Sequence, residues 1–91
     1  VAQDYAQALA LYRQAAEQGH AGAQTNLGVL FYKGSGIKKD YVEADKWFNI
    51  ASAADHEDAK VNRNLMEKLM TPVQIAEAQR QATEWLQTQQ K

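Results

Sequence analysis

The stretch KGSGIKKDY, residues 33–41, holds two of the five glycines of this 91-residue chain and separates two helix-like segments. A phosphate-binding loop would need G-x-x-x-x-G-K-[ST] after a strand, and a dinucleotide-binding loop would need G-x-G-x-x-G between a strand and a helix. Neither spacing is present. Gly34 instead suits a left-handed residue after a helix, Gly36 suits a reversal, and Asp40 suits the N-cap of the next helix. The stretch therefore predicts a turn that joins two helices.

The sequence on both sides of this turn repeats with a period of 36 residues. Seven positions are identical at that shift, where the composition would give about two by chance. The identical pairs are Asp4/Asp40, Tyr5/Tyr41, Ala8/Ala44, Ala15/Ala51, His20/His56, Ala23/Ala59 and Asn26/Asn62. A fixed period of this length indicates copies of one supersecondary unit that stack on each other.

Each copy contains two helices. The chain has one proline and no run of β-branched residues, and its apolar residues recur at helical spacing. Helices are predicted over residues 4–18, 21–33, 40–54, 57–70 and 71–87. Asp4, Asp40 and Thr71 are the expected N-caps, and Gln74 completes a capping box with Thr71. Gly28 lies inside a predicted helix, which indicates that another backbone passes close by.

The composition excludes several classes of function. Lysines and arginines number 10 against 11 acidic residues, so the net charge is −1 and no basic face for nucleic acid is expected. The chain has no cysteine, which removes disulfides, thiol chemistry and cysteine-based zinc sites. No apolar run approaches the roughly 20 residues that span a bilayer, so no membrane insertion is expected.

The repeated residues resemble Sel1-like repeats, which are relatives of the tetratricopeptide family. The family pattern A-x-x-x-L-G-x-x-Y-x-x-G-x-G-V followed by D-x-x-x-A-x-x-W-[YF]-x-x-A-A is matched over one full copy. The matching residues are Ala23, Leu27, Gly28, Phe31, Gly34, Gly36, Ile37, Asp40, Ala44, Trp47, Phe48, Ala51 and, slightly displaced, Ala53. The resemblance divides a single repeat domain, residues 1–91, into three parts. Residues 4–19 form the second helix of a preceding repeat, 20–55 a complete repeat, and 56–91 a degenerate repeat with a C-terminal capping helix.

The resemblance implies an all-α fold, a right-handed solenoid of helical hairpins with about five helices. It also implies a non-catalytic scaffold or adaptor that binds a peptide or protein in a concave groove. In this superfamily the first helix of each pair lines the groove, so its non-core positions are the candidate binding residues. These are Thr25, Asn26, Val29, Tyr32, Lys33, Val61, Asn62 and Leu65. Asn26 and Asn62 occupy matched positions, where they either contact a peptide backbone or bridge adjacent helices.

The sequence supports a catalytic or metal-binding role for individual residues less strongly than it supports a scaffold. His20 and His56 are one whole repeat apart and neither has a ligand at i+4, so structural or solvated roles are favoured over metal binding. Lys38 and Lys39 leave anion binding at the turn as a minor alternative. No residue stands in a recognisable nucleophile arrangement, and we expect no enzyme, catalytic residue, cofactor or metal.

Two alternatives to a peptide-binding groove stay open. The first is a structural module that forms homo-oligomers through an exposed end of the solenoid. The second is an enzyme or a binder of small molecules, which the absence of any catalytic constellation disfavours.

Overall fold

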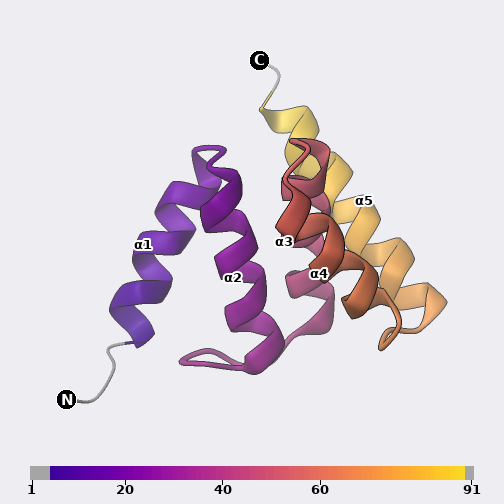
Figure 1. Cartoon of the computed structure of the whole chain (residues 1–91), viewed down its shortest axis with the longest axis horizontal. Helices are drawn as coiled ribbons and strands as arrows, with labels where there is room; N and C mark the ends of the chain where they lie inside the picture. The colour runs from indigo at the N-terminus through magenta and orange to yellow at the C-terminus, as the bar shows by residue number, and fades with distance from the viewer. Residues whose placement is uncertain (1–4, 90–91) are drawn as a thin grey trace.

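The computed structural model describes residues 5–89 and contains five helices and no strand within that range (Figure 1). The helices are α1 (Tyr5–Glu17), α2 (Ala21–Lys33), α3 (Tyr41–Ala53), α4 (Glu57–Glu67) and α5 (Pro72–Thr88). Successive helices run in opposite directions, and α3 occupies the centre, where it packs against α2, α4 and α5. The arrangement is an all-α helical solenoid, as the sequence predicts.

The helix N-termini show why these segments begin where they do. Asp40 accepts a hydrogen bond from the backbone N–H of Glu43 at 3.0 Å, and its own N–H donates to the carbonyl of Phe31 instead of completing a capping box. Thr71 and Gln74 form the full reciprocal box, at 3.1 Å and 2.9 Å. The predicted cap Asp4 lies outside the described residues.

The two copies of the repeat make the same backbone turn. His20 N–H donates to the carbonyl of Ala15 at 3.2 Å, and His56 N–H donates to Ala51 at 3.2 Å, which is the same bond 36 residues later. The loop after α2 is reversed by Gly34 and Gly36, which have φ angles of 71° and 74°. These left-handed angles favour glycine, so the predicted turn is confirmed.

Helices α2 and α3 come into close contact at Gly28. A Cβ placed on Gly28 would lie 2.5 Å from the Phe48 ring and 3.0 Å from the carbonyl oxygen of Ala44. The absence of a side chain therefore lets the two helices approach until the Phe48 ring packs on the α2 backbone. The buried core around this contact consists mainly of Ala23, Leu27, Phe31, Ala44, Trp47, Phe48, Ile50, Met66, Ala78 and Ala82.

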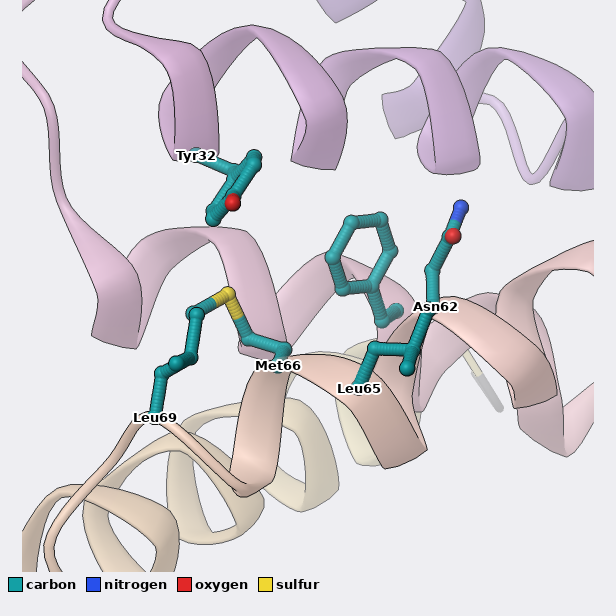
Figure 2. Close-up of a pocket in the computed structure, with 6 residues that line it drawn as sticks. Tyr32, Asn62, Leu65, Met66 and Leu69 are labelled. Atoms are coloured by element: carbon teal, nitrogen blue, oxygen red, sulfur yellow. The ribbon is translucent and has the colours of Figure 1, made fainter.

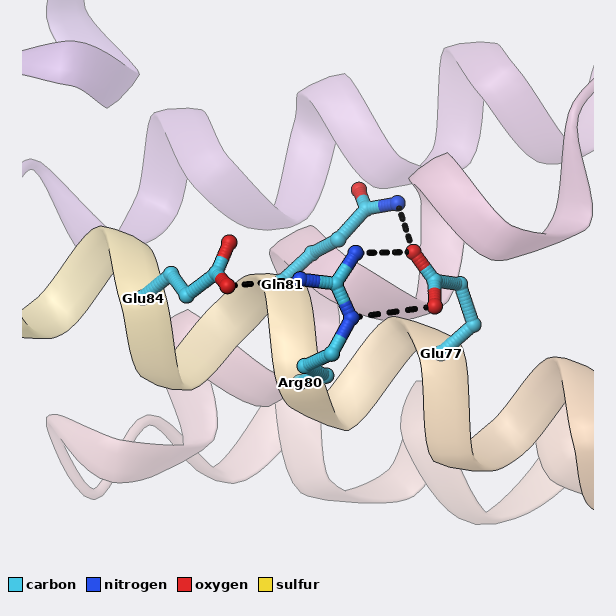
Figure 3. A network of polar contacts seen from close by, with 4 residues as sticks. All are labelled: Glu77, Arg80, Gln81 and Glu84. Carbon is cyan, nitrogen blue, oxygen red and sulfur yellow. Dashed lines mark hydrogen bonds and ion pairs between the residues drawn. The ribbon is translucent and has the colours of Figure 1, made fainter.

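The last helix packs on α3. Trp85 meets Trp47 edge to face at 5.6 Å between ring centroids, and Ala78 and Ala82 are buried in the same interface. The outer face of α5 is polar, because Arg80 forms ion pairs with Glu77 and Glu84 (Figure 3). Helix α5 therefore has one apolar face, toward α3, and one charged face.

Helix α4 is shorter than predicted. The helix ends at Glu67 rather than at Met70. A tight turn follows, in which Leu69 N–H donates a hydrogen bond to the carbonyl of Met66 at 2.9 Å. Pro72 accounts only for the conformation of Thr71, because a proline disfavours helical conformation in the residue before it. Thr71 is accordingly extended, with φ −76° and ψ 158°.

We expect Gly28→Ala to destabilise the protein, although alanine ordinarily stabilises a helix interior by about 1 kcal/mol over glycine. The new methyl group would overlap Phe48, and overpacking of this kind costs about 1–3 kcal/mol. Thermal unfolding followed by circular dichroism measures the difference.

Gly22→Ala is the matched control, because it lies in the same helix and its Cβ would meet only the His20 side chain at 3.4 Å. We expect this variant to unfold at or above the wild-type temperature. An equal or higher melting temperature for Gly28→Ala would contradict the packing assigned to Gly28.

Candidate functional site

A small pocket opens between α2 and α4, with α3 forming its floor. Its volume is about 120 Å³, and its lining residues are Tyr32, Phe48, Asn62, Leu65, Met66 and Leu69. Figure 2 shows Tyr32 reaching into the pocket from α2, opposite the side chains that come from α4 and the turn after it. The lining is apolar except for the Tyr32 hydroxyl and the Asn62 amide.

The α2 side of the pocket is held in place by aromatic contacts. Tyr32 lies in the last turn of α2 and stacks on Tyr41 of α3, with ring centroids 5.9 Å apart and planes 25° apart. Phe48, which is buried against Gly28, closes the floor. The contact that brings α2 and α3 together therefore also fixes two of the pocket's aromatic rings.

The α4 side presents an apolar stripe. Val61 and Leu65 are four residues apart and so share one face of α4, while Leu69 lies in the turn after α4. Each of the three is more than half exposed. Leu65 and Leu69 line the pocket, and Val61 extends the same face along α4. We call Val61, Leu65 and Leu69 the apolar stripe. Exposed apolar side chains gathered in this way are typical of interaction surfaces.

The structure places three of the eight predicted groove residues in the pocket lining: Tyr32, Asn62 and Leu65. The other five lie outside that lining. Val61 is on the apolar stripe, Asn26 and Lys33 are exposed on α2, and Val29 is half-buried there. Thr25 does not face solvent: it is buried, and its hydroxyl donates to the carbonyl of Ala21 at 3.0 Å.

The two matched asparagines have separate surroundings. Asn62 lines the pocket, whereas Asn26 is exposed outside it. Across residues 5–89, no hydrogen bond joins their side chains, and neither amide bonds to another group. The predicted bridge between adjacent helices is therefore absent from the described part of the chain, and the Asn62 amide faces the pocket.

Sequence reasoning missed three lining residues: Phe48, Met66 and Leu69. Leu69 lies 36 residues after Lys33, which was a candidate, so applying the 36-residue shift to Lys33 as well would have found it. Phe48 and Met66 are both buried core residues that also face the pocket. Periodicity identifies such residues as core and gives no sign of their second role.

A buried carboxyl group, Asp45, lies between α3 and α4. Asp45 has no exposed surface, and its Oδ1 has no hydrogen-bond partner. Asn49 Nδ2 donates to Asp45 Oδ2 at 3.0 Å and reaches Glu67 Oε2 at 3.5 Å. Burial, and then the neighbouring Glu67 carboxylate, raise the pKa of Asp45 to about 8.

The other residues considered for chemistry have structural positions. His20 caps α2 by accepting a bond from Ala23 N–H at 3.3 Å, and His56 stands at the matching position before α4. Lys38 and Lys39 are exposed. Within the described residues there is no cluster of three or more histidine, cysteine or acidic side chains that could hold a metal ion. Nor does any helix in that range have the length and apolar character needed to cross a membrane.

Comparison with known proteins identifies the repeat. A family model described as Sel1 repeat matches residues 1–20 and 21–56. An uncharacterized protein of Neisseria meningitidis serogroup B is 58% identical over 36 residues, which cover 40% of this chain and 8% of that protein.

A solved structure has the same arrangement of helices. The crystal structure of c5321, described as a protective antigen present in uropathogenic Escherichia coli strains displaying an SLR fold, matches with a TM-score of 0.84 and 38% identity. The match covers 87% of this chain and 17% of that one. The chain therefore spans less than a fifth of the length of either relative.

Proposed function

We propose that this chain is a non-catalytic protein-interaction module that binds a peptide or protein segment in the pocket between α2 and α4. The premise is its family: the chain belongs to the Sel1 repeat family. Sel1 repeats are generally protein-interaction scaffolds, and the concave surface of a stacked helical array is the surface that such proteins use for binding.

The size and lining of the pocket support this function. Sites for small molecules typically enclose about 300–1,000 Å³, whereas this pocket has about 120 Å³. It suits one apolar side chain of a partner. The apolar stripe continues from the pocket along α4, so a segment anchored by one side chain has further apolar surface to cover. The Asn62 amide can pair with the partner's backbone.

The proposed absence of catalysis is supported by the same lining. Tyr32 is the one titratable group among the six lining residues, and the other polar group in that lining is the Asn62 amide, which is neither an acid nor a base. General acid–base chemistry needs a positioned acid or base at the reacting atom. This pocket offers shape and apolar contact instead.

Peptides selected from a random displayed library against the folded protein test the proposal. We expect Leu65→Ala to weaken binding of the selected peptides roughly tenfold, because truncating a central apolar contact costs about 1–2 kcal/mol. Affinity is measured by calorimetry or fluorescence anisotropy.

Val73→Ala is the control, because Val73 is 79% exposed on α5 while Leu65 is 56% exposed in the pocket. The control should bind as the wild type does. Equal affinities for wild type and Leu65→Ala would contradict the assignment of the pocket.

The two asparagines give a second, finer prediction. We expect Asn62→Ala to weaken binding of the selected peptides more than Asn26→Ala, since only Asn62 lines the pocket. Tyr32→Ala, alone or combined with Asn26→Ala, should also weaken binding, while the circular dichroism spectrum stays that of the folded protein. An equal loss in the two asparagine variants would place the peptide elsewhere on α2.

Self-association through one end of the solenoid is the second candidate function, and one observation favours it. Leu11 of α1 occupies the repeat position of Trp47, which Trp85 covers, yet Leu11 is 61% exposed. A helix from a second copy could cover it. Light scattering should then show a wild-type mass that rises with protein concentration. The Leu11→Arg variant should keep the mass of the monomer at every concentration. A constant monomer mass would exclude this function.

A further inference from the structure

The buried group Asp45 stands where the preceding copy of the repeat has an apolar residue. Shifting by 36 residues pairs Asp45 with Leu9, Glu67 with Phe31, and Asn49 with Arg13. The α1–α2 junction is accordingly apolar: Leu9 packs on the core, Phe31 is buried, and Arg13 lies over the Phe31 ring at 5.8 Å. The α3–α4 junction replaces this set with two carboxyl groups and an amide.

Two ionised carboxylates in such a place would be strongly unfavourable. Asp45 is fully buried, and Asn49 is the one amide that bonds to it. A like charge nearby and the loss of water both disfavour the ionised form. A proton on Asp45 removes one of the charges and turns that carboxyl into a donor. The Glu67 carboxylate meets the same Asn49 amide as Asp45 does and is therefore the neighbouring acceptor.

We infer that Asp45 and Glu67 are positioning residues for the pocket: they share one proton, and this proton holds the last turn of α4 against α3. Glu67 is the last residue of α4 and directly follows Met66, which lines the pocket. Loss of the shared proton leaves two negative charges together and releases that turn. The effect on ligand binding rests on the proposed function, whereas the sharing of the proton does not.

The charged groups around the pair set the direction of the pH dependence. Glu67 and Arg63 of α4 both act on Asp45, and Arg63 opposes the shift, while no described charged group of α2 or α5 contributes. The folded protein holds the Asp45 proton more tightly than the unfolded chain does. Its contribution to stability is therefore complete below the ordinary range of aspartate and is lost as the pH rises through about 8.

Other shifted carboxyl groups act in a separate pH range. Arg80 and Gln81 hold the pKa of Glu77 at about 2, and Lys60 lowers the pKa of Asp55. Groups with lowered pKa values lose their contribution only as the pH falls through the acidic range. A decline in stability that starts above about pH 4 and levels off above about pH 8 is therefore the expected signature of the Asp45–Glu67 pair.

The two methionines of the chain provide a local readout. Protein labelled with ¹³C at the methionine methyl groups gives one signal for Met66, in the pocket beside Glu67, and one for Met70. We expect the Met66 signal of the wild type to move through one transition between about pH 6 and pH 9. The melting temperature should fall by about 5 °C or more over the same interval.

Asp45→Asn should abolish both effects, because its amide donates to Glu67 without a titrating proton. Asp58→Asn, an exposed position in the first turn of α4, is the matched control and should behave as the wild type does. His20 and His56 are retained in both variants, so any contribution from the histidines is common to all three proteins. Parallel pH profiles for wild type and Asp45→Asn, in the Met66 signal and in melting, would overturn the inference.

Two further variants keep the test decisive if Asp45→Asn does not fold. Glu67→Gln removes the like charge but leaves Asp45 buried, so it should move the transition to lower pH. Asp45→Leu combined with Glu67→Phe restores the residues of the preceding repeat, and it should fold with no transition in this range. A transition that survives in Asp45→Leu with Glu67→Phe, or one that Glu67→Gln leaves at the wild-type pH, would overturn the inference.

The Met66 signal and the melting temperature are measured without a binding partner. The proposed function and the proton-sharing pair can therefore fail independently of each other. If the selected peptides bind Leu65→Ala with wild-type affinity, the proposed function alone is overturned. A flat Met66 profile in the wild type would overturn the proton-sharing pair alone.

Discussion

The contact between the bare backbone of Gly28 and the Phe48 ring is the constraint on which the other features depend. It sets the spacing of α2 and α3, and it leaves Phe48 at the floor of the pocket and Tyr32 stacked on Tyr41. Protein interiors are packed densely enough that one added methyl group must displace its neighbours. The candidate binding site is therefore a direct consequence of how one repeat closes on itself.

The two halves of the chain use the same backbone turns and different side chains. Where the α1–α2 junction is apolar, the α3–α4 junction contains Asp45 and Glu67. A buried polar group lowers stability relative to an apolar one unless it is fully hydrogen-bonded. Glu67 directly follows Met66, which lines the pocket, and this connects the local departure from the repeat with the surface that is proposed to bind.

Much of the fold follows from the 36-residue period, the caps and the glycines, because these encode local backbone geometry. The same period locates Tyr32, Asn62 and Leu65 near one another. Burial of individual polar side chains does not follow from it: Thr25 bonds back to its own helix, and Asp45 occupies a core position that its charge would assign to the surface. Nor does the pattern indicate that α5 packs on α3, since that depends on tertiary contacts such as Trp47 with Trp85.

The surface proposed for binding is small and combines three features. These are one pocket for an anchoring side chain, one amide, and the apolar stripe beside them. A crystal structure of the protein with a selected peptide tests this claim most directly. The expected result is an apolar side chain of the peptide seated among Tyr32, Phe48 and Met66, with its backbone near Asn62. A peptide bound along α1 or on the outer face of α5, with the pocket empty, would contradict it.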